Sequence, residues 1–150
     1  MKNDESGLSH SLTLPARMAS FDAFMAFVRQ TAESLNIRAP VISKFELAAE
    51  ELLVNVVHYA YAGSDAPGDI EMRCGMAAPD MFCMEVRDKG APFNPLQAGT
   101  PDLSGSMDER PVGGLGIFLV RELADRLDYY REENTNTIVF CKSIAPQNGA

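Results

Sequence analysis

The chain has few positive charges for its size. It carries 13 Lys and Arg against 21 Asp and Glu, so its formal net charge is −8 over 150 residues. Nucleic-acid binding rests on neutralising phosphates with Lys and Arg, and anionic membrane surfaces attract the same side chains. The charge balance therefore argues against direct nucleic-acid contact and against membrane contact. It leaves proteins and small ligands as partners.

Cysteines and long apolar runs are also scarce. There are three cysteines, an odd number, and no two of them have metal-ligand spacing. Cys74 and Cys83 fall in predicted strands, where we expect them to be unpaired and to act as small apolar side chains. No stretch approaches a membrane span, and no apolar run follows the polar N-terminus as in a signal peptide. A cytoplasmic, reducing location is the expectation that follows.

Hydrophobic residues make up 46% of the chain, which is enough for one buried core at this length. We expect one domain over residues 10–144. The polar stretch at residues 1–9 is predicted to be disordered, and the tail at residues 145–150 to be loose.

Periodicity predicts the elements of this domain. Apolar residues at helical spacing indicate helices at about residues 19–35, 41–59 and 115–127. Short alternating or apolar runs between turn residues predict strands at 11–14, 70–74, 81–87, 128–132 and 137–142, with a polar turn at 134–136. Strands and helices in this order are typical of an α+β sandwich, one sheet with helices on one face.

Glu51, Asn55 and His58 lie on one face of the predicted second helix. At about 100° per residue they fall within a band of roughly 60°, and the apolar stripe is centred roughly 140° from Glu51. An Asn amide oxygen suits Mg²⁺, and a nearby carboxylate can accept a proton in phosphoryl transfer. The alternative interpretation is a solvated polar face. For His58 it is a packing or hydrogen-bonding role beside Tyr59 and Tyr61.

Asp88, Lys89 and Gly90 follow an apolar predicted strand. Asp88 can accept a hydrogen bond from an exocyclic amine such as that of adenine, and Gly90 permits backbone geometry that other residues resist. Lys89 is a weaker candidate for reaching a phosphate. An ordinary Asp-x-Gly turn is the alternative interpretation.

The run Gly113-Gly114-Leu115-Gly116 enters the third predicted helix. The first N–H groups of a helix lack intrahelical partners and favour anions, and glycines let a phosphate approach the main chain. No Gly-Lys-Ser or Gly-Lys-Thr follows, so the run is not a Walker A motif. A flexible loop ending at a helix is the alternative interpretation.

A long segment rich in Pro and Gly, at about residues 93–112, precedes these glycines. Such a segment in a compact domain is usually disordered or a functional lid. Arg110 near its end can reach a terminal phosphate through charge-assisted hydrogen bonds. It can equally be a solvated loop charge.

Taken together, the Glu-x-x-x-Asn, Asp-x-Gly-x-Pro-Phe and Gly-Gly-Leu-Gly segments resemble the N, G1 and G2 boxes of Bergerat-fold (GHKL) ATPases. Chain length and the runs at residues 86–93 and 108–120 are most similar to the small bacterial anti-sigma factor serine/threonine-protein kinases. The resemblance covers residues 10–144. It implies a histidine kinase-like ATPase domain, a two-layer α/β sandwich whose mixed, mostly antiparallel sheet carries helices on one face.

The resemblance also implies that Mg²⁺-ATP binds between the helices and the lid. Glu51 would be the catalytic base that activates a serine hydroxyl, Asn55 would hold Mg²⁺, and Asp88 would read adenine. The other nucleotide-binding residues that it implies are Gly90, Phe93, Arg110, Gly113, Gly114, Leu115 and Gly116.

The function that this family implies is phosphorylation of a STAS-domain anti-anti-sigma factor in a partner-switching pathway. A sigma factor is the second partner of many members, and many work as homodimers. The alternative is an ATP-binding switch that sequesters a sigma factor or another regulatory partner with little catalysis. Glu51 favours the kinase, because a sequestering protein has no need of a base at that position.

Overall fold

The structure is a computed structural model that describes residues 8–61, 68–97 and 114–144. Most of the predicted lid lies outside these residues, as do residues 1–7 and the tail at 145–150. The elements in chain order are β1 (His10–Pro15), η2 (Met18–Ser20), α1 (Phe21–Ser34), α2 (Ala39–Asn55), η3 (Val56–Ala60), β2 (Asp69–Ala78), β3 (Met81–Asp88), η4 (Pro95–Gln97), α3 (Gly114–Leu123), β4 (Arg126–Glu132) and β5 (Thr135–Ser143).

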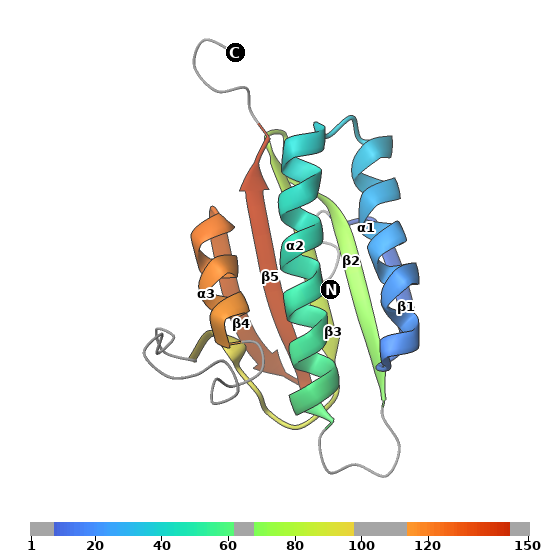
Figure 1. The fold of residues 1–150 in the computed structure, drawn as a ribbon, viewed down its shortest axis with the longest axis vertical. Helices are drawn as coiled ribbons and strands as arrows, with labels where there is room; N and C mark the ends of the chain where they lie inside the picture. The colour runs from blue at the N-terminus through green and yellow to red at the C-terminus, as the bar shows by residue number, and fades with distance from the viewer. Residues whose placement is uncertain (1–7, 62–67, 98–113, 145–150) are drawn as a thin grey trace.

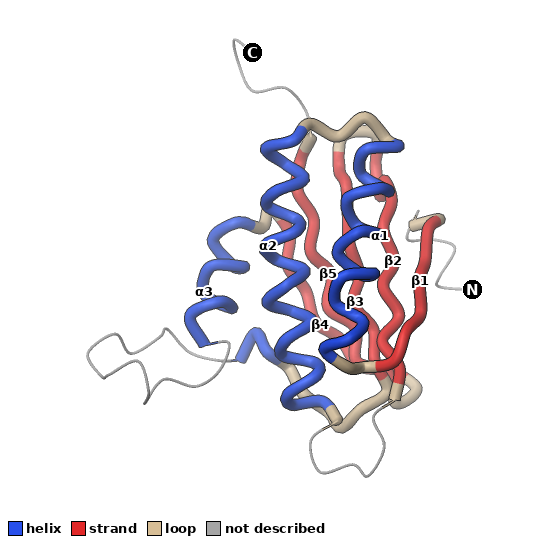
Figure 2. The backbone as a smooth tube through the Cα atoms, turned by 45° about the vertical axis from the view of Figure 1, so that its right-hand side comes forward, coloured by secondary structure: helices blue, strands red, loops and turns tan. Residues whose placement is uncertain are grey.

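The described strands form one sheet in the order β1-β2-β3-β5-β4. Every neighbouring pair is antiparallel, so the sheet predicted to be mixed and mostly antiparallel is antiparallel throughout these five strands. Figures 1 and 2 show α1, α2 and α3 on one face of the sheet. The opposite face, which we call the open face, carries no described helix. The predicted α+β fold, a two-layer α/β sandwich, is confirmed.

The core lies between the sheet and the helices. Along β3, Phe82, Met84 and Val86 alternate with residues of the open face and point toward the helix layer, as strand geometry requires. Phe45 of α2 packs edge-on against Phe82 and Phe140, with ring centroids 4.7 and 5.0 Å away. Burying each such ring stabilises the fold by about 1.5–3 kcal/mol. This packing holds α2 over the centre of the sheet.

Two element boundaries differ from the prediction in ways that affect the site. The third helix ends at Leu123 rather than near residue 127, because β4 begins at Arg126 and pairs with β5. The predicted turn at residues 134–136 is shorter, since Glu133 and Asn134 take positive φ values of 55° and 62° and close a tight hairpin. Asn136 is therefore a strand residue, and it pairs with Asp88.

The expectation that Cys83 is an unpaired thiol was wrong. Cys83 of β3 and Cys141 of β5 are directly opposed in the sheet, with Cα atoms 4.1 Å apart, and form a disulfide. Their separation of 58 residues hides this pairing in the sequence. Cys74 is free and buried, as expected, and its burial raises the pKa of its thiol.

In the parts of the chain that the structure describes, none of the helices has both the length and the apolar character that crossing a membrane requires.

Candidate functional site

The C-terminal end of α2 places Glu51 and Asn55 one helical turn apart. The Asn55 side chain is 3% exposed, and its Nδ2 donates a 2.7 Å hydrogen bond to the backbone carbonyl of Glu51. This bond occupies the amide nitrogen, so the Oδ1 atom is what the side chain can offer to a cation. After Asn55 the chain continues as a π-helical turn, η3, a widening often found at functional sites.

Glu51 lies where α2 meets the start of α3. A Cβ atom added to Gly116 would overlap the Glu51 carboxylate, so the carboxylate packs directly on the backbone of the glycine segment. Burial raises the pKa of Glu51, and the neighbouring charge of Glu50 raises it further. A half-buried carboxyl group with a raised pKa is better matched to proton acceptance near neutral pH than a fully solvated one.

We expect Gly116→Ala to displace the Glu51 side chain and to lower the stability of the domain. Overpacking of this kind costs typically about 1–3 kcal/mol, and the displaced carboxylate should also transfer protons less well. Thermal unfolding and the rate of phosphoryl transfer are the measurements.

A double-variant cycle with Glu51→Ala tests the cause of that loss. If the overlap with Glu51 is responsible, Gly116→Ala should cost clearly less stability when residue 51 is already Ala. An equal cost in both backgrounds would contradict direct packing between these two residues.

Asp88 ends β3 with its side chain on the helix-facing side of the sheet. The residue is 5% exposed, and its Oδ1 accepts hydrogen bonds from the backbone N–H of Gly90 at 2.8 Å and from Asn136 Nδ2 at 3.0 Å. Burial raises the pKa of Asp88, while these two bonds and the positive charge of Arg131 act in the opposite direction. Two N–H groups thus donate to a buried carboxylate at the end of a strand.

Gly90 fastens the loop after β3 to η3. A Cβ atom added to Gly90 would overlap the backbone carbonyl of Ala60, and the next residue, Ala91, donates its N–H to that same carbonyl at 2.8 Å. The ring of Phe93 then stacks on Tyr59 of η3, with centroids 5.2 Å apart. The C-terminal end of the α2–η3 segment and the Asp88 loop therefore form one continuous wall.

Other predicted residues are less tightly placed. The side chains of His58 and Lys89 are exposed, and the backbone N–H of Lys89 donates a hydrogen bond to the Tyr61 hydroxyl at 2.9 Å. Gly114 and Leu115 open α3. Arg110 and Gly113 lie outside the described residues, so their predicted roles stay predictions.

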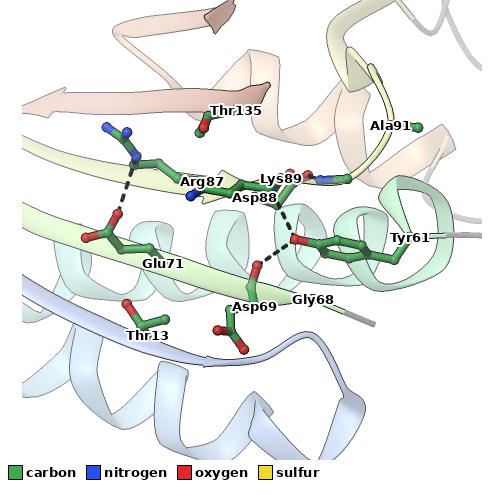
Figure 3. Close-up of a pocket in the computed structure, with 11 residues that line it drawn as sticks. Thr13, Tyr61, Gly68, Asp69, Glu71, Arg87, Asp88, Lys89, Ala91 and Thr135 are labelled. Carbon is green, nitrogen blue, oxygen red and sulfur yellow. Dashed lines mark hydrogen bonds and ion pairs between the residues drawn. The ribbon is translucent and has the colours of Figure 1, made fainter. Parts of the chain in front are cut away.

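A pocket of about 710 Å³ lies at the same end of the sheet but on its open face (Figure 3). Glu71 and Arg87, which line it, alternate along their strands with core residues and so point away from the helices. Asp88 and Gly90 also line it. Glu51, Asn55 and Gly116 do not line it, so this pocket is not the site that the three motifs predict.

Sequence reasoning missed Asn136. Its amide bridges Asp88 to the loop after β3, through bonds from Nδ2 to Asp88 Oδ1 and to the Ala91 carbonyl at 2.9 Å. The residue stands in a polar run, Asn134-Thr135-Asn136-Thr137, that is typical of a turn. Only the register of β3 and β5 reveals that it faces Asp88.

The donor set fits a magnesium ion that is held chiefly by phosphates. The described residues contain no group of three or more His, Cys, Asp or Glu arranged to hold a metal by themselves. Mg²⁺ keeps several waters and is commonly bound through one or two protein oxygens together with substrate phosphates. A single amide oxygen from Asn55 at the α2–α3 junction suits that mode of binding.

The chain is similar to a known domain family and to individual proteins of known name. Residues 14–142 match the family of the histidine kinase-like ATPase domain. The serine/threonine-protein kinase BtrW of Bordetella bronchiseptica is 29% identical over 102 residues, which cover 68% of this chain and 70% of that protein. The serine-protein kinase RsbW of Staphylococcus aureus is 26% identical over 136 residues, which cover 85% of this chain and 84% of that protein.

Two solved structures have the same fold. The RsbU and RsbW domains of a Mycobacterium tuberculosis protein align with a TM-score of 0.62 at 15% identity, over 92% of this chain and 34% of that chain. The SiaB–SiaC complex of Pseudomonas aeruginosa aligns with a TM-score of 0.60 at 10% identity, over 95% of this chain and 94% of that chain. At such identities the likeness concerns the fold alone.

Proposed function

This chain belongs to the histidine kinase-like ATPase domain family, and on that basis we propose that it is a Mg²⁺-ATP-dependent serine/threonine-protein kinase. Its substrate would be a STAS-domain regulatory protein. The proposal is supported by relatives named as serine or serine/threonine kinases. The observation that carries it is the half-buried Glu51 carboxylate, packed against the backbone of Gly116 at the start of α3.

Glu51 would act as the general base. As the serine or threonine oxygen of the partner attacks the γ-phosphorus, the carboxylate accepts the hydroxyl proton, and ADP leaves. Proton acceptance requires the ionised form, and the raised pKa of Glu51 makes that form a stronger base. The group therefore works only above its raised pKa, where it still has appreciable affinity for the proton.

The remaining residues would bind and orient the nucleotide. Asn55 would hold Mg²⁺, which supplies charge neutralisation at the phosphates. The N–H groups of Gly114 and Gly116, in the first turn of α3, would donate to phosphate oxygens. Asp88 would accept a hydrogen bond from the adenine amine, with Gly90 and Phe93 shaping the wall beside it. Leu115, Gly113 and Arg110 complete the proposed set.

The partner assignment extends the same proposal. Phosphorylation of the STAS-domain protein would lower its affinity for the kinase and leave the kinase free to capture a sigma factor. We include a homodimer in this scheme. The single domain at residues 10–144, with the lid at about 93–112, would carry all of these activities.

Incubation of the chain with γ-labelled ATP, Mg²⁺ and candidate STAS-domain proteins tests the function. We expect label on a serine or threonine of one of those proteins, and no label when Mg²⁺ is chelated. ATP binding without label on any partner would contradict the kinase and favour the non-catalytic switch. Absence of ATP binding would contradict both.

A further inference from the structure

We propose that Asn136 is a positioning residue for Asp88, and that through Asp88 it sets the preference of the site for a base bearing an exocyclic amine. The proposal rests on the proposed nucleotide-binding function. It assigns to β5 a role that none of the three motifs contains. Asn136 is 2% exposed and lies directly opposite Asp88 in the sheet.

The orientation of the Asn136 amide is fixed by what surrounds it. Its Oδ1 accepts hydrogen bonds from the Tyr129 hydroxyl at 2.6 Å and from Arg131 Nη1 at 3.0 Å. Both of these groups are donors, so the oxygen must face them. The amide nitrogen is thereby turned toward two acceptors, the Asp88 carboxylate and the carbonyl of Ala91.

Arg131 strengthens this arrangement from β4. The same Nη1 atom that donates to Asn136 also donates to the carbonyl of Gly90 at 3.0 Å. One guanidinium group therefore supports both the amide and the loop that follows Asp88. Its positive charge also favours the ionised form of the Asp88 carboxylate. The β4–β5 hairpin thus holds the loop after Asp88 through Arg131 and Asn136.

The hydrogen bonds from described residues to the Asp88 carboxylate reach one of its two oxygens and not the other. Among the described residues, both donors to the carboxylate, Gly90 N–H and Asn136 Nδ2, reach Oδ1. The second oxygen, Oδ2, is left as the atom that a ligand can approach. An ionised carboxylate can only accept hydrogen bonds. It therefore favours an amine on the ligand and disfavours a keto oxygen at the same place.

Isothermal titration of ATP and GTP into two Asn136 variants tests the inference. Asn136→Ala removes both bonds of the amide nitrogen. Asn136→Asp keeps the shape but replaces the donor with an oxygen, so no cavity explains its effect. For both we expect ATP to bind at least about tenfold more weakly, with a smaller ratio of ATP to GTP affinity. Thr135→Ala, an adjacent change on the open face of β5, should leave both affinities unchanged.

The pH profile of ATP affinity distinguishes positioning of Asp88 by Asn136 from a role of Asn136 in stability alone. Without the Asn136 donor, the pKa of Asp88 should rise further, so the loss of ATP affinity at acid pH should begin at a higher pH in Asn136→Ala. Among the residues that the structure describes, the ionisable groups that interact with Asp88 are Arg131 from β4 and Tyr61 from the turn after η3. Both groups remain in the variant, and Arg131 keeps its bond to the Gly90 carbonyl, so neither charge is removed by the substitution.

Unchanged ATP affinity, ATP-to-GTP ratio and pH profile in a folded Asn136→Ala protein would overturn the proposal. If Asn136→Ala does not fold, Tyr129→Phe removes one bond to Oδ1 and should shift the same three quantities in the same direction by less; no shift would also overturn it. Absence of ATP binding in the unsubstituted chain would instead contradict the proposed function, on which the inference rests.

Discussion

Replacement of Glu51 by Gln is expected to keep ATP affinity within about twofold and to slow phosphoryl transfer by about 10²–10⁴-fold, the usual contribution of a positioned general base. Gln has nearly the same shape as Glu, so its packing on Gly116 should survive. It cannot accept the hydroxyl proton. Calorimetric titration of ATP and the rate of labelling of the partner protein measure the two effects separately.

Glu50→Gln is the matched control for this change. Glu50 is the preceding residue of α2 and is exposed, so its replacement should leave transfer within about threefold of the original rate, as expected for a group outside the site. Glu50 also raises the pKa of Glu51 by charge repulsion, and its loss should move the acid limb of the transfer rate to slightly lower pH. Equal loss of transfer in the two variants would remove Glu51 from the chemistry.

The same carboxylate sets the expected pH dependence of the original protein. Because the pKa of Glu51 is raised, the ionised base is lost at a higher pH than for a solvated glutamate. Transfer should fall as the pH drops through that raised pKa. The residual transfer of Glu51→Gln should lack this limb. The transfer rate falls at low pH because the base must be ionised to act.

The elements of the fold could be predicted from the sequence because each carries its own local pattern. Phe45 belongs to a stripe with a 3.6-residue period, and Val86 to an apolar strand bounded by turn residues, so α2 and β3 were placed correctly. The end of α3 was misplaced by a few residues. Leu127 reads as a continuation of the helical pattern, but pairing with β5 makes it a strand residue.

The parts that could not be predicted depend on which strands pair. Asp88 and Asn136 are 48 residues apart and meet only because β3 and β5 are neighbours in one register. The same is true of Cys83 and Cys141. A motif search finds Asp88 because the turn that follows it has a local signature. It cannot find Asn136, whose polar surroundings in sequence give no sign of its burial in the structure.

Asp88→Asn is expected to weaken ATP binding by about 10- to 150-fold, the equivalent of losing a hydrogen bond to a charged acceptor worth about 1.5–3 kcal/mol. The neutral amide offers an N–H donor where the carboxylate offered only acceptors. Its amide oxygen can keep the two bonds that Oδ1 accepts from Gly90 N–H and Asn136 Nδ2, which places the NH₂ group at the position of Oδ2, where the ligand amine would bind. Calorimetric titration of ATP measures the loss, and thermal unfolding separates it from loss of the fold.

Asp69→Asn distinguishes nucleotide binding at the predicted site from binding in the open-face pocket. Asp69 lines the 710 Å³ pocket together with Asp88, and its backbone carbonyl accepts a hydrogen bond from the Tyr61 hydroxyl, a contact that Asp69→Asn retains. Its side chain alternates along β2 with the buried Ile70 and so lies on the open face of the sheet. If ATP binds between the helices and that loop, Asp69→Asn should leave its affinity unchanged while Asp88→Asn lowers it. Equal losses in both variants would place the nucleotide on the open face. In that case Glu51 would be separated from the γ-phosphate by the sheet, and its assignment as the base would be wrong.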